Sequence, residues 1–111
     1  KFSNIHSTKF TGALVGSHQT LSGAGAVNLT THVTEVTTTG SAAALTLANG
    51  TVGQIKIITL AVDGGGNATL TPTTFANGST ITFEDAQDTV MLVYVTSVGW
   101  SVVSNQGCTV A

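Results

Sequence analysis

The chain has 111 residues, of which 41% are apolar and only 7% are charged, with a formal net charge of −2. Ordinary soluble domains carry about 25% charged residues, so uncharged polar residues must supply most of this surface, and threonine alone occurs 21 times. Three basic residues, Lys1, Lys9 and Lys56, are too few for a nucleic-acid-binding patch, and the lack of a long apolar run argues against a membrane partner.

The N-terminal residues 1–23 differ from the rest of the chain. They contain two of the three lysines and two of the three histidines. Three large apolar residues, Phe2, Ile5 and Phe10, would be unusual in a free tail. We therefore predict an extended N-terminal arm over 1–23 that adds a strand to a neighbouring subunit, with a disordered leader as the alternative. The folded β-domain is expected over 24–111.

The remaining elements all have the pattern of short strands. Apolar and polar residues alternate, or apolar residues run together, between turn signals spaced about 8–12 residues apart. This pattern predicts an all-β fold, either an antiparallel β-sandwich or a small barrel. The predicted strands in chain order are Ala26–Val36 with a bulge near Thr34 and Glu35, Ala44–Leu47, Gln54–Val62, Ala68–Thr71, Thr80–Phe83, Thr89–Val95, Gly99–Ser104 and Cys108–Val110.

Local signals predict specific turns and one aromatic contact. The dipeptides Asn49-Gly50 and Asn77-Gly78 favour tight turns, so we predict a hairpin around each. Trp100 is the only tryptophan of the chain. We predict that it lies in the core and pairs with Tyr94 across a further hairpin, with a surface site for sugar stacking as the alternative.

Two of the predicted strands, Gln54–Val62 and Thr89–Val95, are apolar on both faces. One face of each must pack into the core of the subunit, so the second face needs another cover. Obligate interfaces resemble a domain core cut in half, and we therefore predict a homotrimer. The predicted interface residues are Ile58, Leu60, Val62, Met91 and Val93, with Ile55 and Ile57 on the other face of their strand.

The carboxylates do not indicate an enzyme. A glycosidase needs two acids that face each other across the sugar, whereas Glu84, Asp85 and Asp88 lie together in one short segment. We interpret this segment as a solvated loop, with calcium ligation as the alternative. Lys56 is expected at a surface rim, paired with Glu84 or Asp85.

The histidines and the cysteine do not indicate a metal site or a redox site. His6, His18 and His32 are widely spaced and have no cysteine nearby, so a zinc site within one chain is not expected. Cys108 is the single cysteine, which excludes an intrachain disulfide. We therefore predict no catalytic activity, no metal and no cofactor.

The segment from Leu21 to Ala111 resembles a small β-structural domain of tailed-phage virion proteins, especially those of marine and cyanobacterial phages. The resemblance is carried by "ALTLANGTVGQIK", by the "LTP" edge, by the "TITF" strand and by "GWSVV" near the end of the chain. It implies a trimeric part mounted on the surface of a head, fibre or spike.

These features together lead to a functional prediction. We expect a capsid decoration or cement protein, located on the capsid surface of the virion, that trimerises there and stabilises the phage head. Its partner would be the major capsid protein, and attachment is assigned to Phe2, Ile5 and Phe10 of the arm, which have no partner strand of their own. The alternative is a receptor- or glycan-binding domain of a phage fibre, spike or collar protein.

Overall fold

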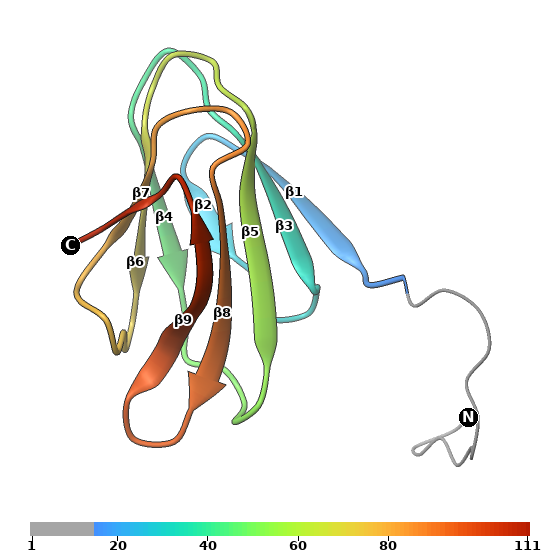
Figure 1. The fold of residues 1–111 in the computed structure, drawn as a ribbon. Coiled ribbons are helices and arrows are strands. Elements are labelled where there is room, and N and C mark those ends of the chain that lie inside the picture. The colour runs from blue at the N-terminus through green and yellow to red at the C-terminus, as the bar shows by residue number, and fades with distance from the viewer. Residues whose placement is uncertain (1–14) are drawn as a thin grey trace.

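The computed structural model describes residues 15–111, which form ten β-strands in two layers (Figure 1). In spatial order, sheet A contains β1 (His18–Ser22), β3 (Val33–Thr37), β5 (Ile55–Val62), β8 (Thr89–Val95) and β9 (Gly99–Gln106). Sheet B contains β10 (Thr109–Val110), β7 (Ile81–Phe83), β6 (Ala68–Pro72), β4 (Ala43–Leu47) and β2 (Gly25–Val27). The prediction of an all-β sandwich is confirmed.

Both sheets are mixed, so the prediction of an antiparallel sandwich is wrong. From β1 to β6 the chain alternates between the sheets, and each strand returns to its sheet in the direction of the previous strand there. As a result β1, β3 and β5 are parallel neighbours in sheet A, and β2, β4 and β6 are parallel neighbours in sheet B. The later strands β7, β8, β9 and β10 join these by antiparallel pairing.

The same alternation removes one of the predicted hairpins. The strands β4 and β5 belong to different sheets, so residues 48–54 form an arch between the layers instead of a hairpin turn. Gly50 is needed in this arch because a Cβ atom there would lie 2.8 Å from the Trp100 ring. Asn77-Gly78 does connect an antiparallel pair, β6 and β7, but within the longer connection 73–80.

The strand predicted over Ala26–Val36 is interrupted in the structure. Asn28 Oδ1 accepts hydrogen bonds from Thr31 N at 3.1 Å and from Thr31 Oγ1 at 2.6 Å, and this turn carries the chain from sheet B to sheet A. The segment is therefore divided into β2 and β3. The bulge predicted near Thr34 and Glu35 is not in this strand: the register with β5 shifts between Val36 and Thr37, and the extra residue is Ala61 on β5.

The predicted arm over 1–23 extends too far along the chain. His18–Ser22 forms β1, an edge strand of sheet A that pairs with β3, so the sandwich begins before residue 24. Phe2, Ile5 and Phe10 lie outside the described residues.

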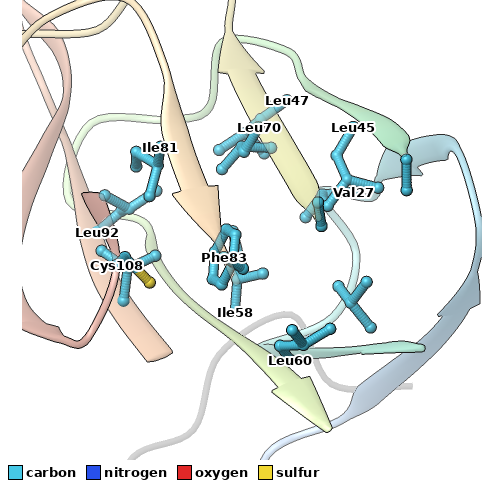
Figure 2. Packing of buried hydrophobic residues seen from close by; sticks show 14 of the residues in the cluster. Val27, Leu45, Leu47, Ile58, Leu60, Leu70, Ile81, Phe83, Leu92 and Cys108 are labelled. Atoms are coloured by element: carbon cyan, nitrogen blue, oxygen red, sulfur yellow. The ribbon is translucent and has the colours of Figure 1, made fainter. Parts of the chain in front are cut away.

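The core lies between the sheets and is built from one face of each. Figure 2 shows these side chains pointing toward one another across the two layers. Burial of an aliphatic or aromatic side chain of this size contributes about 1.5–3 kcal/mol. The fully buried apolar residues include Leu45, Leu47, Ile58, Leu60, Leu70, Ile81, Phe83, Val90 and Leu92.

Trp100 closes the core at the start of β9, where its side chain is fully buried. Its Nε1 donates a hydrogen bond to Ala48 O at 2.9 Å, which joins β9 to the arch after β4. Its ring meets the edge of the Tyr94 ring with centroids 5.3 Å apart and planes at 76°. The predicted aromatic pair and core position are confirmed, and this burial leaves no exposed indole for sugar stacking.

Candidate interaction surfaces

The strand directions give the sandwich two distinct ends (Figure 1). We call the end from which β1, β3 and β5 start the arm end, because residue 15 connects there to the N-terminal segment. Hydrogen bonds from Gln54 Nε2 to Leu29 O at 2.9 Å and from Ala76 N to Trp100 O at 2.8 Å link the segments of this end. The arm end comprises residues 15–17, 28–32, 48–54, 73–80 and 96–98.

The loops of the arm end combine uncharged polar residues with several exposed apolar side chains, and His32 is their one ionisable side chain. These loops contain no lysine, arginine, aspartate or glutamate. Val15, Val52 and Val98 are 86%, 62% and 45% exposed, and Ile55 and Val95 are exposed where strands meet this end. Of the seven large apolar residues that are exposed within residues 15–111, five therefore gather here. Exposed apolar residues concentrated at one end indicate an interaction site more than singly scattered ones do.

The opposite end is acidic and contains four of the five carboxylates of the chain, Asp63, Glu84, Asp85 and Asp88. Asp88 is buried, so the interpretation of this segment as a solvated loop is wrong for that residue. Its Oδ2 accepts hydrogen bonds from Glu84 N at 2.9 Å and from Asp85 N at 3.0 Å. Through these two hydrogen bonds the Asp88 carboxylate fixes the backbone conformation of the 84–88 loop. Within residues 15–111 no three histidine, cysteine, aspartate or glutamate side chains form a candidate metal site.

Asp88→Asn is expected to lower the free energy of unfolding by about 1–2 kcal/mol, because two charge-assisted hydrogen bonds become neutral ones. Urea unfolding at pH 7 measures the change. Asp85→Asn is the matched control, since the Asp85 side chain is exposed, and it should change stability by less than about 0.5 kcal/mol. Equal effects of the two substitutions would contradict a structural role specific to Asp88.

The outer face of sheet A is the second apolar surface expected from the sequence, but its residues differ from the prediction. Ile58 and Leu60 point into the core and are fully buried, so they cannot form the predicted interface. The alternation of side chains along the strand correctly placed both residues on the same face of β5, but it did not show which face packs into the core. Val62 is exposed near the acidic end of β5.

Met91 and Val93 do lie on this outer face, together with three apolar residues that were not predicted there. Ile57 is in register with Val33 on β3 and with Met91 on β8, and Ile55 is opposite Val93. We call Val33, Ile55, Ile57, Met91 and Val93 the outer strip. Ile55 is 40% exposed and the other four side chains are partly exposed.

The flanks of the outer strip are mainly polar and nearly uncharged. On β9, Ser101 is opposite Val93 and Ser104 is opposite Met91, and Val103, which the register shift leaves unpaired between them, is 56% exposed. On the other side, His18 of β1 is in register with Val33, and its Nε2 lies 3.9 Å from Glu35 Oε2. This face therefore has an apolar centre between hydroxyl groups on one edge and a single histidine and glutamate toward the other.

Lys56 is a buried lysine, which the sequence interpretation missed. Its side chain is fully buried, and its Nζ donates hydrogen bonds to Thr31 O at 2.7 Å, to Thr31 Oγ1 at 3.2 Å and to Thr34 Oγ1 at 3.1 Å. The predicted pairing with Glu84 or Asp85 is wrong, since those acids lie at the opposite end. The signal was available, because positions 56, 58 and 60 of one strand share a face.

The acceptors of Lys56 belong to a larger polar network in which no side chain other than Lys56 is charged. Thr34 Oγ1 donates to Gln19 Oε1 at 2.9 Å, and Gln19 Oε1 also accepts from Asn28 N at 3.0 Å. The network thereby joins β1, the turn after β2, β3 and β5. Burial lowers the pKa of Lys56 from 10.5 to about 8, because it penalises the charged ammonium.

Cys108 and the histidines show no arrangement that supports chemistry. Cys108 is free and buried, and burial, together with the negative charge of Asp88, raises the pKa of its thiol to about 12. The thiolate is the reactive form of cysteine, so this thiol is inert at neutral pH. His18 and His32 are exposed, and His6 lies outside the described residues.

The search for a membrane-spanning helix and the comparisons with known proteins do not assign a functional class. Residues 15–111 contain no helix that is long and apolar enough to cross a membrane. No protein-family model matches the chain, and no curated protein matches it either. The resemblance to tailed-phage virion domains therefore stays a prediction.

Proposed function

We propose that this chain is a structural protein of a tailed-phage virion: a decoration or cement subunit that forms homotrimers on the capsid surface and binds the major capsid protein. In this role it catalyses no reaction and needs no cofactor. The observation that carries the proposal is the polarity of the sandwich. Exposed apolar residues gather at the arm end, and carboxylates gather at the opposite end.

This polarity fits a subunit with one face on a shell and the other in solvent. Docking through the arm end buries valine and isoleucine side chains and leaves no charged group of its loops without water. The acidic end then points away from the particle, where negative charge opposes particle association. Residue 15, to which the N-terminal segment is joined, lies at the docking end, so contacts of that segment with the same shell would add to the docking.

The stabilising effect of such a subunit follows from mass action. A protein that binds the assembled shell but not its separated parts stabilises the shell by about 2.7 kcal/mol per site at a hundredfold excess over Kd. Repetition over a lattice makes this a large mechanical gain. The alternative function, a glycan- or receptor-binding domain, has less support because the single tryptophan is buried.

The proposal predicts that positive charge at the arm end weakens docking to the capsid. We expect Val52→Lys combined with Val98→Lys to lower the affinity for phage heads that lack this protein at least tenfold, because two unpaired ammonium groups would be buried. Co-sedimentation with such heads measures binding. Val62→Lys is the matched control, since it places the same charge on an exposed valine near the acidic end, and it should bind as the unmodified protein does.

The arm is tested in the same assay. Removal of residues 1–14 leaves β1 intact and should weaken binding further, because Phe2, Ile5 and Phe10 are lost. If the double lysine variant and the truncated chain both bind heads with unchanged affinity, docking uses neither the arm end nor the arm, and the proposed orientation is wrong.

A further inference from the structure

We infer that the outer strip is the surface through which copies of this chain pack against one another, with β5 and β8 facing a threefold axis. The inference rests on the homotrimer in the proposed function and names its interface. Unlike the sequence prediction, it places Val33, Ile55 and Ile57 in the interface. It assigns Ile58 and Leu60 to the core of the subunit.

The outer strip has the composition of an interface core. Its five apolar side chains lie on three adjacent strands in direct register, so they form one continuous surface. Ser101 and Ser104 on β9 border it with hydroxyl groups. An apolar centre that lacks charge and is surrounded by a polar rim is the usual anatomy of a protein interface.

The charge distribution favours a second copy as the occupant. The strip contains no lysine, arginine, aspartate or glutamate, so identical surfaces can meet without repulsion. Within residues 15–111, the ionisable groups beside it are His32, which precedes Val33, and His18 and Glu35, which already lie 3.9 Å apart. A partner with charged contact residues would find no counter-charge on the strip.

The size of the face can be compared with what a trimer needs. Five strands about 4.8 Å apart, each contributing about six residues with a rise of about 3.3 Å, give a face of roughly 500 Å². In a closed trimer three such faces bury roughly 1,500 Å² in total and roughly 500 Å² between each pair of neighbours, so neighbouring surfaces must supply the rest of a specific interface. The apolar residues of the arm end adjoin the strip through Ile55 and extend it.

A closed ring of three accounts for the edges of sheet A better than a face-to-face pair. Within residues 15–111, β1 pairs on one side only, whereas the second side of β9 is partly covered, because Trp100 bonds to Thr74 and Ala76 and Val102 N donates to Asn77 Oδ1. Around a threefold axis, β1 of one copy would lie beside the uncovered end of β9 of the next, and closure of the ring would cover the open parts of both edges. A face-to-face dimer would leave both edges open, and open edges invite uncontrolled association.

The test is the oligomeric state of the isolated protein at micromolar concentration, measured by sedimentation velocity. We expect the unmodified chain to sediment with three times the mass of the 11.1 kDa subunit. Ile57→Lys should sediment as a monomer, with association weakened at least tenfold. The matched control Val62→Lys, on the same strand but outside the strip, should remain trimeric.

A cysteine placed in the strip provides a second measurement that does not depend on a disruptive charge. Met91→Cys should form disulfide-linked dimers under mild oxidation of the trimer, because the strips of neighbouring copies face one another. Val62→Cys should not. Cys108 does not interfere, since it is buried and its thiol is inert.

Results that contradict the proposed interface can be distinguished from results that contradict the trimer or the proposed function. If the unmodified chain and Ile57→Lys are both trimers and Met91→Cys does not cross-link, the strip is not the interface, although the trimer and the proposed function stand. If the unmodified chain is a monomer while the chain lacking residues 1–14 associates, the arm of the same chain covers the strip, and the inference is wrong. A monomer in both forms overturns the inference and the trimer, and the binding of heads is tested separately.

Discussion

Trp100→Ala is expected to lower the free energy of unfolding by about 3–5 kcal/mol, the range for removal of a large aromatic side chain from a core. The residue is fully buried, donates its Nε1 hydrogen bond to Ala48 O and meets the Tyr94 ring edge-on. Its loss would leave a cavity at the arm end and an unpaired carbonyl in the 48–54 arch. Thermal unfolding should show a fall in Tm of roughly 12–30 °C for a domain of this size.

Two further variants separate the contributions of Trp100. Trp100→Phe keeps an aromatic ring but removes the hydrogen-bond donor to Ala48 O. Its Tm should lie between those of the unmodified protein and Trp100→Ala. Tyr94→Leu keeps an apolar side chain and removes the edge-to-face contact, which is expected to contribute about 0.5–1.5 kcal/mol. A Trp100→Ala protein with a Tm within a few degrees of the parent would contradict the buried position of the indole.

The contribution of Lys56 to the free energy of unfolding is expected to rise by roughly 3 kcal/mol between about pH 8 and 10.5. Cys108, whose pKa is raised to about 12, opposes this rise above about pH 9, so the difference between the unmodified protein and Lys56→Met measures the Lys56 contribution. The pKa of Lys56 is lowered by burial from 10.5 to about 8. Between these values the unfolded chain binds a proton at Lys56 that the folded chain has released, so raising the pH favours folding. Below about pH 8 the ammonium is charged in both states, and the protein carries the whole penalty of its burial.

The three hydrogen bonds from Lys56 Nζ set a limit to this effect. All three acceptors are uncharged oxygens of Thr31 and Thr34, and a neutral amine has only two hydrogens to donate. Part of the gain is therefore offset by one lost hydrogen bond. Urea unfolding at several pH values from 7 to 10.5 measures the slope. Lys56→Met is the control, and a rise of equal size in that variant would assign the effect to other groups.

Much of the local structure could be predicted because it depends on neighbours in the chain. The alternation of apolar and polar residues located most of the strands, and the Tyr94–Trp100 pair followed from the short segment that joins them. The strand predicted over Ala26–Val36 failed for an equally local reason, because the Asn28 side chain competes with strand pairing by accepting two hydrogen bonds from Thr31.

The candidate surfaces depended on contacts that are distant in the chain. Ile57 and Ile58 are both large and apolar, so their side chains alone do not distinguish the face that packs on sheet B from the face that remains outside. In the sequence, nothing distinguishes Asp88 from the neighbouring acids Glu84 and Asp85. Only the folded loop brings the backbone N–H groups of Glu84 and Asp85 to the Asp88 carboxylate.

The sequence by itself determined that the chain is all-β, where most strands lie, that Trp100 is in the core and that two strands are apolar on both faces. Periodicity and turn residues carry this information because they act over a few residues. The tertiary structure decided that strands which follow one another alternate between two sheets and become parallel, that the outer strip and not Ile58 and Leu60 faces outward, and that Lys56 is buried. These outcomes depend on which distant strands pair, because pairing selects the face of each strand that loses its contact with water.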